Sequence, residues 1–335
     1  MDFQLTDDQR ALKTGVRELL AARFGRERLR VAVDEGPRLD RALWRELGEA
    51  GFFALRLPEA DGGVGLGLPE AVLAFEEAGR VLLPGPLIAT HLAAGVVDGA
   101  ATGETVVTAV DGGGLVVWLA EADVVRGDAS GAEPLRPVDP LTPLHRVPVS
   151  GVAEPPDVRP VGSTGALPTA PLTSLFTAAE QLGTAARACD TAVQHARTRE
   201  QFGQPIGAFQ AVKHLCAQML VRVELARAAV YAAAVTADPV DIAAARLLAD
   251  EAAVRGARDC LQVHGGMGFT WESDVHLYLK RAWTRTRRTG SATESEELLA
   301  ADLVSGAGPQ GSVQARSGKG RDGCRGSWHT GITER

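Results

Sequence analysis

The sequence is poor in cysteine, with four in 335 residues and no Cys-x-x-Cys pair. A disulfide framework or a structural zinc site is therefore not expected, and this usage is typical of a reducing compartment. The seven histidines show no metal-ligand spacing such as His-Glu-x-x-His. We predict a cytoplasmic protein without a metal.

Long apolar runs and an excess of positive charge are missing too. The longest weakly polar run, residues 87–97, is too short to span a bilayer and contains Thr90 and His91. The first residues, MDFQLTDDQR, lack the basic-then-apolar order of a signal peptide. Asp and Glu (42) outnumber Lys and Arg (35), which excludes the basic footprint of a nucleic-acid-binding protein. We expect neither a membrane nor a nucleic acid as partner.

Aromatic residues make up only 5% of a chain that is 45% hydrophobic, so we expect a core of small aliphatic side chains packed between helices. Residues 1–99 are predicted to form an N-terminal helical domain. Thr6 with Gln9 has the pattern of a capping box, and Asp40 can cap a second helix.

The pattern changes over residues 100–170, for which we predict a truncated β domain with connecting loops. Two β-like runs, 106–110 and 115–119, flank an Asp-Gly-Gly-Gly turn and predict a hairpin. Ten of the eighteen prolines lie between Pro134 and Pro171, so no helix can run through that region.

Helical spacing returns over residues 171–304 in three long segments, and Asp238-Pro239 can start the third. These segments predict a C-terminal helical bundle. Residues 305–335 are rich in glycine and lack periodicity, and we predict a disordered tail. The expected fold class is thus mainly α with a reduced central β unit.

Two strings stand out in the bundle: Arg199–Gln210 (REQFGQPIGAFQ) and 262–270 (QVHGGMGFT). In the first, a guanidinium could bind phosphate, although a helix corner with a solvated arginine explains it equally well. In the second, glycine N–H groups could cradle phosphate oxygens, although glycine also simply ends helices. Either string alone is a weak signal.

The order of the two strings along the chain is a more specific signal than either string alone. Together with residues 3–10 and the Leu57–Gly63 segment, the two strings make residues 1–303 resemble the acyl-CoA dehydrogenase family. The resemblance implies an N-terminal helical domain, a central β domain and a C-terminal four-helix bundle. It also implies FAD, whose ADP half the two strings hold for a neighbouring subunit. The residues that match these cofactor-binding positions are Arg199, Gln201, Phe202, Gln210, Gln262, Gly265, Gly266 and Gly268.

Two parts of the family pattern are missing. We find no Thr-Glu-Pro…Gly-Ser-Asp string, which holds the flavin ring and the thioester, between Leu87 and Leu172. The catalytic carboxylate, which must reach the substrate α-carbon, is replaced by residues 290–293 (GSAT) at one family position and by Thr173 at the other. Glu180 is interpreted as a solvated helix residue. We therefore predict no catalytic residue in this chain.

This combination resembles the shortened subunit of the α2β2 acyl-CoA dehydrogenases of steroid side-chain degradation. The resemblance implies an enzyme active only as a heterotetramer, in which a full-length acyl-CoA dehydrogenase subunit supplies the ring pocket and the base. An acyl-CoA thioester is the implied substrate, with a steroid side chain as one acyl group that the resemblance allows. An electron-transfer flavoprotein is a further implied partner. A flavin-free scaffold and an autonomous dehydrogenase with a relocated base are the alternatives.

One charged cluster remains to be assigned. Five cations fall between Lys280 and Arg288, and they could meet the phosphates of CoA or FAD. The more common origin of such a cluster is a solvated helix face, which is the interpretation adopted for this segment.

Overall fold

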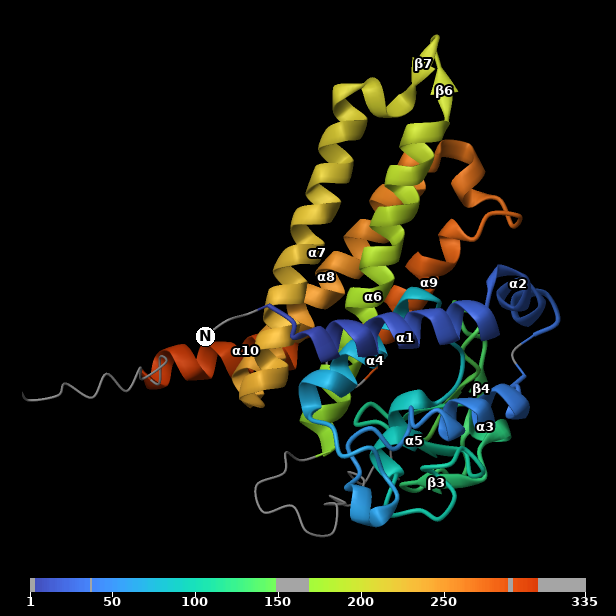
Figure 1. Ribbon diagram of the computed structural model, residues 1–335, viewed down its shortest axis with the longest axis vertical. Coiled ribbons are helices and arrows are strands. Elements are labelled where there is room, and N and C mark those ends of the chain that lie inside the picture. The colour runs from blue at the N-terminus through green and yellow to red at the C-terminus, as the bar shows by residue number, and fades with distance from the viewer. Residues whose placement is uncertain (1–3, 37, 149–168, 289–291, 307–335) are drawn as a thin grey trace, which may run out of the picture.

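The structure is a computed structural model that describes residues 4–36, 38–148, 169–288 and 292–306. Long helices rise from a base of shorter helices and small sheets, and the β6–β7 turn forms the outermost point at the top of Figure 1. The mainly α fold with a small β unit confirms the predicted fold class. The tail that we predict to be disordered lies outside the described residues from residue 307 on.

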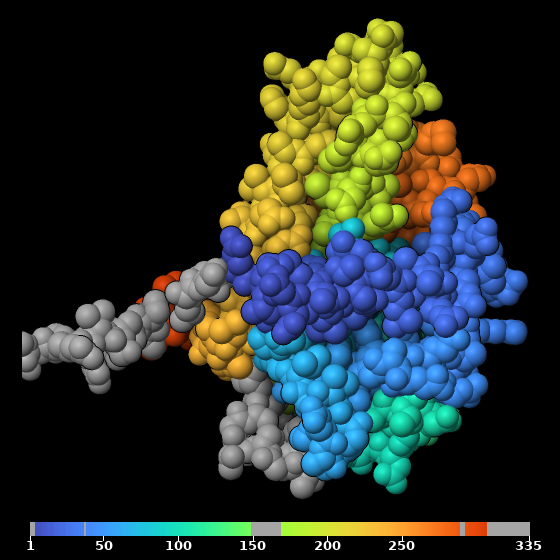
Figure 2. Space-filling model, in the orientation of Figure 1, coloured from blue at the N-terminus to red at the C-terminus, as the bar shows by residue number. Residues whose placement is uncertain are grey.

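The N-terminal part consists of short helices that wrap around the base of the bundle. Its five α-helices are α1 (Asp7–Arg23), α2 (Arg26–Asp34), α3 (Arg41–Glu49), α4 (Leu68–Arg80) and α5 (Leu87–Ala93). The capping box is confirmed, because the Thr6 hydroxyl accepts from the Gln9 N–H while the Gln9 side chain accepts from the Thr6 N–H. Asp40 caps α3 as predicted. Figure 2 shows α1 lying across the front of the molecule.

The described residues of the β unit form five strands of three residues each: β1 (Val107–Ala109), β2 (Leu115–Val117), β3 (Val124–Arg126), β4 (Glu133–Leu135) and β5 (Leu144–Arg146). The turn between β1 and β2 forms because the Asp111 carboxylate accepts from the N–H groups of Gly113 and Leu115. The predicted hairpin is nevertheless wrong apart from one antiparallel bridge, Val110 to Val116. Strands β1 and β2 do not form a ladder with each other, because each pairs with a strand that comes later in the sequence. β1 pairs in parallel with β3, and β2 pairs antiparallel with β5.

Three long helices, α6 (Thr169–Thr198), α7 (Gln210–Thr236) and α8 (Pro239–His264), form the bundle together with α9 (Val275–Thr286) and α10 (Ala292–Ser305). Between α6 and α7 lies a hairpin of two-residue strands, β6 (Glu200–Gln201) and β7 (Gln204–Pro205), and a short 3₁₀ turn, η5 (Gly265–Phe269), follows α8. Asp238 caps α8 and directly precedes Pro239, the first residue of the helix, as the sequence predicts.

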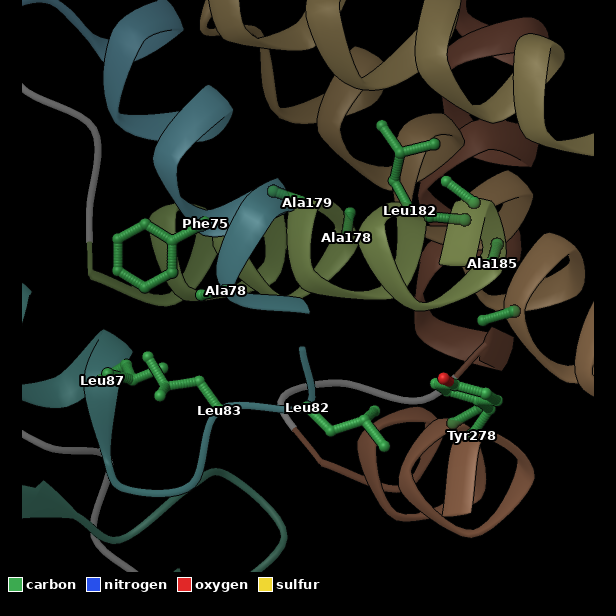
Figure 3. Close-up of a cluster of buried hydrophobic side chains, with 14 of the residues drawn as sticks. Phe75, Ala78, Leu82, Leu83, Leu87, Ala178, Ala179, Leu182, Ala185 and Tyr278 are labelled. Atoms are coloured by element: carbon green, nitrogen blue, oxygen red, sulfur yellow. The ribbon is translucent and has the colours of Figure 1, made fainter. Parts of the chain in front are cut away.

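Helices α4 and α6 pack unusually closely because each helix presents a glycine to the backbone of the other. A Cβ atom on Gly183 would lie 1.9 Å from the Glu76 carbonyl oxygen, and one on Gly79 would lie 2.1 Å from the Glu180 carbonyl oxygen. Figure 3 shows the small side chains on the two helices beside this contact, including Ala78 and Ala178. This close approach fixes the N-terminal helices against the bundle.

A buried acidic residue ties α1 to α4 and α7. The Glu76 carboxylate is 1% exposed and lies 2.6 Å from Lys13 Nζ and 2.7 Å from the Tyr231 hydroxyl, and Arg227 donates to its other oxygen. Burial works against the ionised form, but the charges of Lys13 and Arg227 hold the pKa of Glu76 below its ordinary value. Because every oxygen of this carboxylate has a partner, the cluster is structural rather than reactive.

Candidate cofactor site

The first cofactor string folds into a tight turn at the far end of the bundle. Phe202 and Gly203 both have positive φ, 54° and 78°, which is the geometry that joins two antiparallel strands through a two-residue loop. Phe202 is 91% exposed, and its ring makes an edge-to-face contact with Phe209 at a centroid distance of 6.1 Å. A positive φ is unfavourable for a bulky residue, and the exposed ring gains no burial in this chain that would offset it.

The second string ends α8 and opens into an unobstructed glycine turn. Gly265 adopts φ 60° and ψ −144°, a conformation that essentially only glycine tolerates. A Cβ atom on Gly265 or Gly266 would have no neighbour within 4 Å, so a ligand can approach this backbone closely. Gly268 instead packs against the chain, because its Cβ would lie 3.0 Å from the Leu261 carbonyl oxygen.

A pair of histidines joins the two strings. His195, one turn before Arg199 on α6, stacks on His264 at the end of α8, with ring centroids 4.0 Å apart and an interplanar angle of 21°. The Nδ1 atom of His264 lies 2.8 Å from the Cys260 carbonyl oxygen, so Nδ1–H donates and Nε2 carries no proton in the neutral ring. Partial burial, His264 and Arg199 together lower the pKa of His195. The lowered pKa favours the neutral form of the His195 ring.

The structure thus brings all eight predicted cofactor residues to one end of the bundle. Seven are exposed and only Gly268 is buried; the exposed ones are Arg199, Gln201, Phe202, Gln210, Gln262, Gly265 and Gly266. Within the described ranges no hydrogen bond joins the polar side chains of one string to the other. Their polar groups face solvent, where a diphosphate could receive charge-assisted bonds from the guanidinium and bonds from backbone N–H groups. These residues fit the phosphate end of the dinucleotide that the resemblance implies.

Two aromatic residues at the glycine turn were not among the predicted site residues. Phe269 is 72% exposed and Trp271 is 48% exposed. The Trp271 ring is held by a hydrogen bond from its Nε1–H to Asp34, and Lys280 Nζ lies 4.8 Å from its centroid. The signal was available, since Phe269 lies within the 262–270 string and Trp271 directly follows it.

The resemblance implies that the β domain holds the flavin ring, so the contact between the β unit and the bundle is the second region to consider. Here two of the five cations, Arg281 and Arg285, are buried, so the interpretation as a solvated face is wrong for them, whereas Arg287 is exposed as expected. Arg281 donates to Asp139, both buried, and Arg285 Nε lies 3.1 Å from Glu180 Oε2. Glu180, interpreted as solvated, is only 6% exposed. Burial lowers the pKa of Arg285 to about 10, so the group stays charged and needs its carboxylate.

The space left in this region is small. The cavity between Trp118, Glu180 and Arg281 measures about 20 Å³. A drug-sized or cofactor-sized group needs roughly 300 Å³ or more. This cavity therefore does not fit a flavin ring. Residues 290 and 291 of the segment examined for a catalytic base lie outside the described residues, as does part of the stretch that lacks the ring-binding string.

Two further observations concern metal ions and membranes. Across the described ranges, no group of three or more His, Cys, Asp or Glu side chains is arranged to hold a metal ion. In that same part of the chain, no helix combines the length and the hydropathy needed to cross a membrane.

Comparisons with known proteins place these features in context. Residues 6–104 match the model of the acyl-CoA dehydrogenase N-terminal domain and residues 172–300 that of the C-terminal domain, together more than half of the chain. The β unit lies in the interval between the two matches.

Relatives match over nearly their whole length. The acyl-CoA dehydrogenase IpdE2 of Mycobacterium tuberculosis is 36% identical over 299 residues, which cover 82% of this chain and 91% of the relative. IpdE2 of Mycolicibacterium smegmatis is 34% identical over 89% of this chain and 100% of the relative. Among solved structures, a chain of the ChsE4–ChsE5 complex of Mycobacterium tuberculosis superposes with a TM-score of 0.77 and 26% identity, over 91% of this chain and 99% of that one.

Proposed function

Since the chain belongs to the acyl-CoA dehydrogenase family, we propose that it is one subunit of a heteromeric, FAD-dependent acyl-CoA dehydrogenase. In this proposal it holds the ADP half of the flavin. A full-length partner subunit provides the ring pocket and the catalytic base. When bound, the flavin accepts the hydride that leaves the substrate's β-carbon.

The observation that carries this proposal is a contrast between two ends of the same molecule. At the bundle end, Arg199, Gly265 and Gly266 present a guanidinium and open backbone to solvent. At the β unit, the cavity of about 20 Å³ is walled by charged side chains that already pair with one another. The phosphates of the dinucleotide could therefore bind to this chain, but its flavin ring would need a pocket on a second polypeptide.

The surface around the two turns also favours a partner. Phe202, Met267 and Phe269 are 91%, 67% and 72% exposed, which is unusual for large apolar side chains on a lone chain. The ChsE4–ChsE5 structure, to which this chain is similar, is described as a complex of two proteins. We infer that these apolar residues become buried against the full-length subunit, around the cofactor.

The substrate and the electron acceptor follow from the resemblance alone. We propose an acyl-CoA thioester, with a steroid side chain as the acyl class, and an electron-transfer flavoprotein as the acceptor. The described part of the chain offers no exposed carboxylate at the β unit's contact with the bundle that could serve as the base, since Glu180 is buried and paired.

The test is to purify the chain alone and together with a full-length acyl-CoA dehydrogenase from the same genome. We expect a colourless chain alone and a yellow, active complex. Arg199→Ala should lower the FAD content of the complex, whereas Arg255→Ala, an exposed arginine paired with Glu251 on α8, should not. A yellow, active chain by itself would overturn the proposal. Full FAD content and activity in the Arg199→Ala complex would favour the flavin-free scaffold.

A further inference from the structure

A second cavity lies apart from the cofactor turns, at the junction of α1, α2, α4, α6 and α9. It measures about 350 Å³, and none of its lining residues belongs to the two cofactor strings. This volume is within the range of small-molecule pockets and holds about a dozen water-sized groups. Figure 3 shows two of its walls, Leu82 at the end of α4 and Tyr278 on α9.

Positive charge is in excess among the side chains that line this cavity. The Glu77 carboxylate is 1% exposed and receives two hydrogen bonds from Arg17, with Nε at 2.8 Å and Nη2 at 2.7 Å. Arg80 Nε lies 3.6 Å from the same carboxylate, and Arg80 Nη2 donates to Asp190 at 2.6 Å. Four arginines line the cavity against two carboxylates, those of Glu77 and Asp274. A ligand with negative charge would reduce this excess of positive charge.

The α6 side carries a cation with spare donors. Arg187 is exposed, lines the cavity and bonds to the Tyr278 hydroxyl. Among the residues that the structure describes, no carboxylate lies within 4.0 Å of this guanidinium. A guanidinium has five N–H donors, so one hydroxyl partner leaves most of them available. The first turn of α2 adds to this, because Gly25 caps the helix without a side-chain bond and also lines the cavity.

The remaining wall is apolar. Phe24, Leu29 and Leu82 line the cavity and are each less than 9% exposed. A purely inorganic anion would gain nothing from these side chains, whereas an aliphatic or aromatic body would bury apolar surface against them. The combination of fixed cations and an apolar wall is typical of a pocket that binds an amphiphilic anion.

We propose that this cavity binds a small organic oxyanion, a carboxylate or a phosphate monoester, with an apolar body. Arg187 and Arg80 hold the anionic head, and Phe24 and Leu82 contact the body. This site is independent of the proposed cofactor role, because it uses neither of the cofactor strings.

Isothermal titration calorimetry on the full chain tests the proposal with octanoate, octyl phosphate, inorganic phosphate and octanol as probes. We expect one saturable site for octanoate or octyl phosphate, with inorganic phosphate and octanol binding at least tenfold more weakly. If octanoate is the only tight ligand the head is a carboxylate, and if octyl phosphate is the only one it is a phosphate; both results support the site. Equal binding of octanol, or equal binding of inorganic phosphate, would overturn the proposed chemistry.

Variants test the location. Arg187→Gln changes an exposed side chain and should weaken the binding at least tenfold, and Ala21→Trp, at an exposed wall position of α1, should fill the cavity with the same effect. Arg255→Gln removes an exposed arginine elsewhere and should leave binding unchanged. Circular dichroism confirms that each variant is folded. Binding that survives both Arg187→Gln and Ala21→Trp, or no saturable binding of any anionic probe at millimolar concentration, would refute the site.

Discussion

His195 and His264 stack ring on ring, 4.0 Å between centroids, and so join the helix that ends one residue before Arg199 to the helix that ends in the glycine turn. Helices α6 and α8 also pack against each other along their length. No other described ring pair connects α6 to the end of α8, so this stack contributes to the spacing of the two halves of the candidate cofactor site. Stacked aromatic pairs contribute about 1 kcal/mol beyond their buried area.

The first prediction concerns this stack. His195→Ala should lower the affinity of the complex for FAD several-fold, because about 1 kcal/mol of ring contact that holds the two turns together is lost. His195→Phe keeps a ring in the same place and should retain most of the affinity. The measurement is FAD content after dialysis of the purified complex. Equal losses in the two variants would show that the ring contact does not position the site.

The second prediction concerns Glu180 and its partner Arg285. Glu180→Gln removes the charge but keeps the shape, and it leaves a buried guanidinium without its carboxylate, so the free energy of unfolding should fall by about 3 kcal/mol. Glu251→Gln, in an exposed ion pair with Arg255, should change it by less than about 0.5 kcal/mol. Urea unfolding measures both. At a temperature where the variant is folded, activity of the complex should be unchanged; a large specific loss would identify Glu180 as the relocated base.

The third prediction concerns the close contact of α4 and α6. Gly183→Ala should destabilise the protein by ~3 kcal/mol, because its Cβ would have to displace the Glu76 carbonyl from 1.9 Å. Gly256→Ala is the matched control: it also lies in a bundle helix, but its Cβ has no neighbour within 4 Å. There, alanine should stabilise the helix by about 0.5–1 kcal/mol. Thermal unfolding of the two variants should therefore shift in opposite directions.

The fourth prediction concerns pH and the buried His91. Burial, with the charge of Arg56, lowers the pKa of His91 to about 3, and its Nδ1–H donates to the Phe53 carbonyl oxygen at 3.0 Å. The unfolded chain binds a proton at this histidine near pH 6.5, whereas the folded chain does not. Stability from the neutral ring is thus complete above about pH 6.5 and decreases by about 1.4 kcal/mol per pH unit as the pH falls toward 3.

His91→Asn keeps a donor for Phe53 but cannot titrate, so its stability should fall less steeply on acidification. Urea midpoints at pH 7, 6 and 5 measure this, and the difference between wild type and variant should shrink as the pH decreases. Parallel curves would show that His91 is not kept neutral.

Local patterns predicted those parts of the fold that depend on near neighbours in sequence. The Thr6 capping box, the Asp40 cap and the start of α8 after Asp238 each involve residues within one turn, and the structure has all three. The hairpin after Val110 failed for the opposite reason. The partners of β1 and β2 are β3 and β5, and no turn signal encodes which later strand will pair.

Charge was the least predictable property of the candidate site region. Arg281 and Glu180 look like ordinary solvated residues in sequence, because the side chains that neutralise them, Asp139 and Arg285, are more than a hundred positions away. The cofactor strings were easier to find, since glycine, phenylalanine and arginine at a turn carry their backbone requirements with them. Their assignment to FAD stays a prediction. The His195–His264 contact links residues far apart in sequence and had no local signal.

The buried pairs between α9 and the rest of the molecule, Arg281 with Asp139 and Arg285 with Glu180, also bear on how the protein melts. If the β unit detached first, Arg281 would be left in the interior without its counter-ion. Partial melting is therefore unfavourable, and differential scanning calorimetry on the lone chain should record a single endotherm spanning both halves. The β unit and the bundle can in this way behave as one cooperative unit, held together by ion pairs that dissolved salt cannot reach.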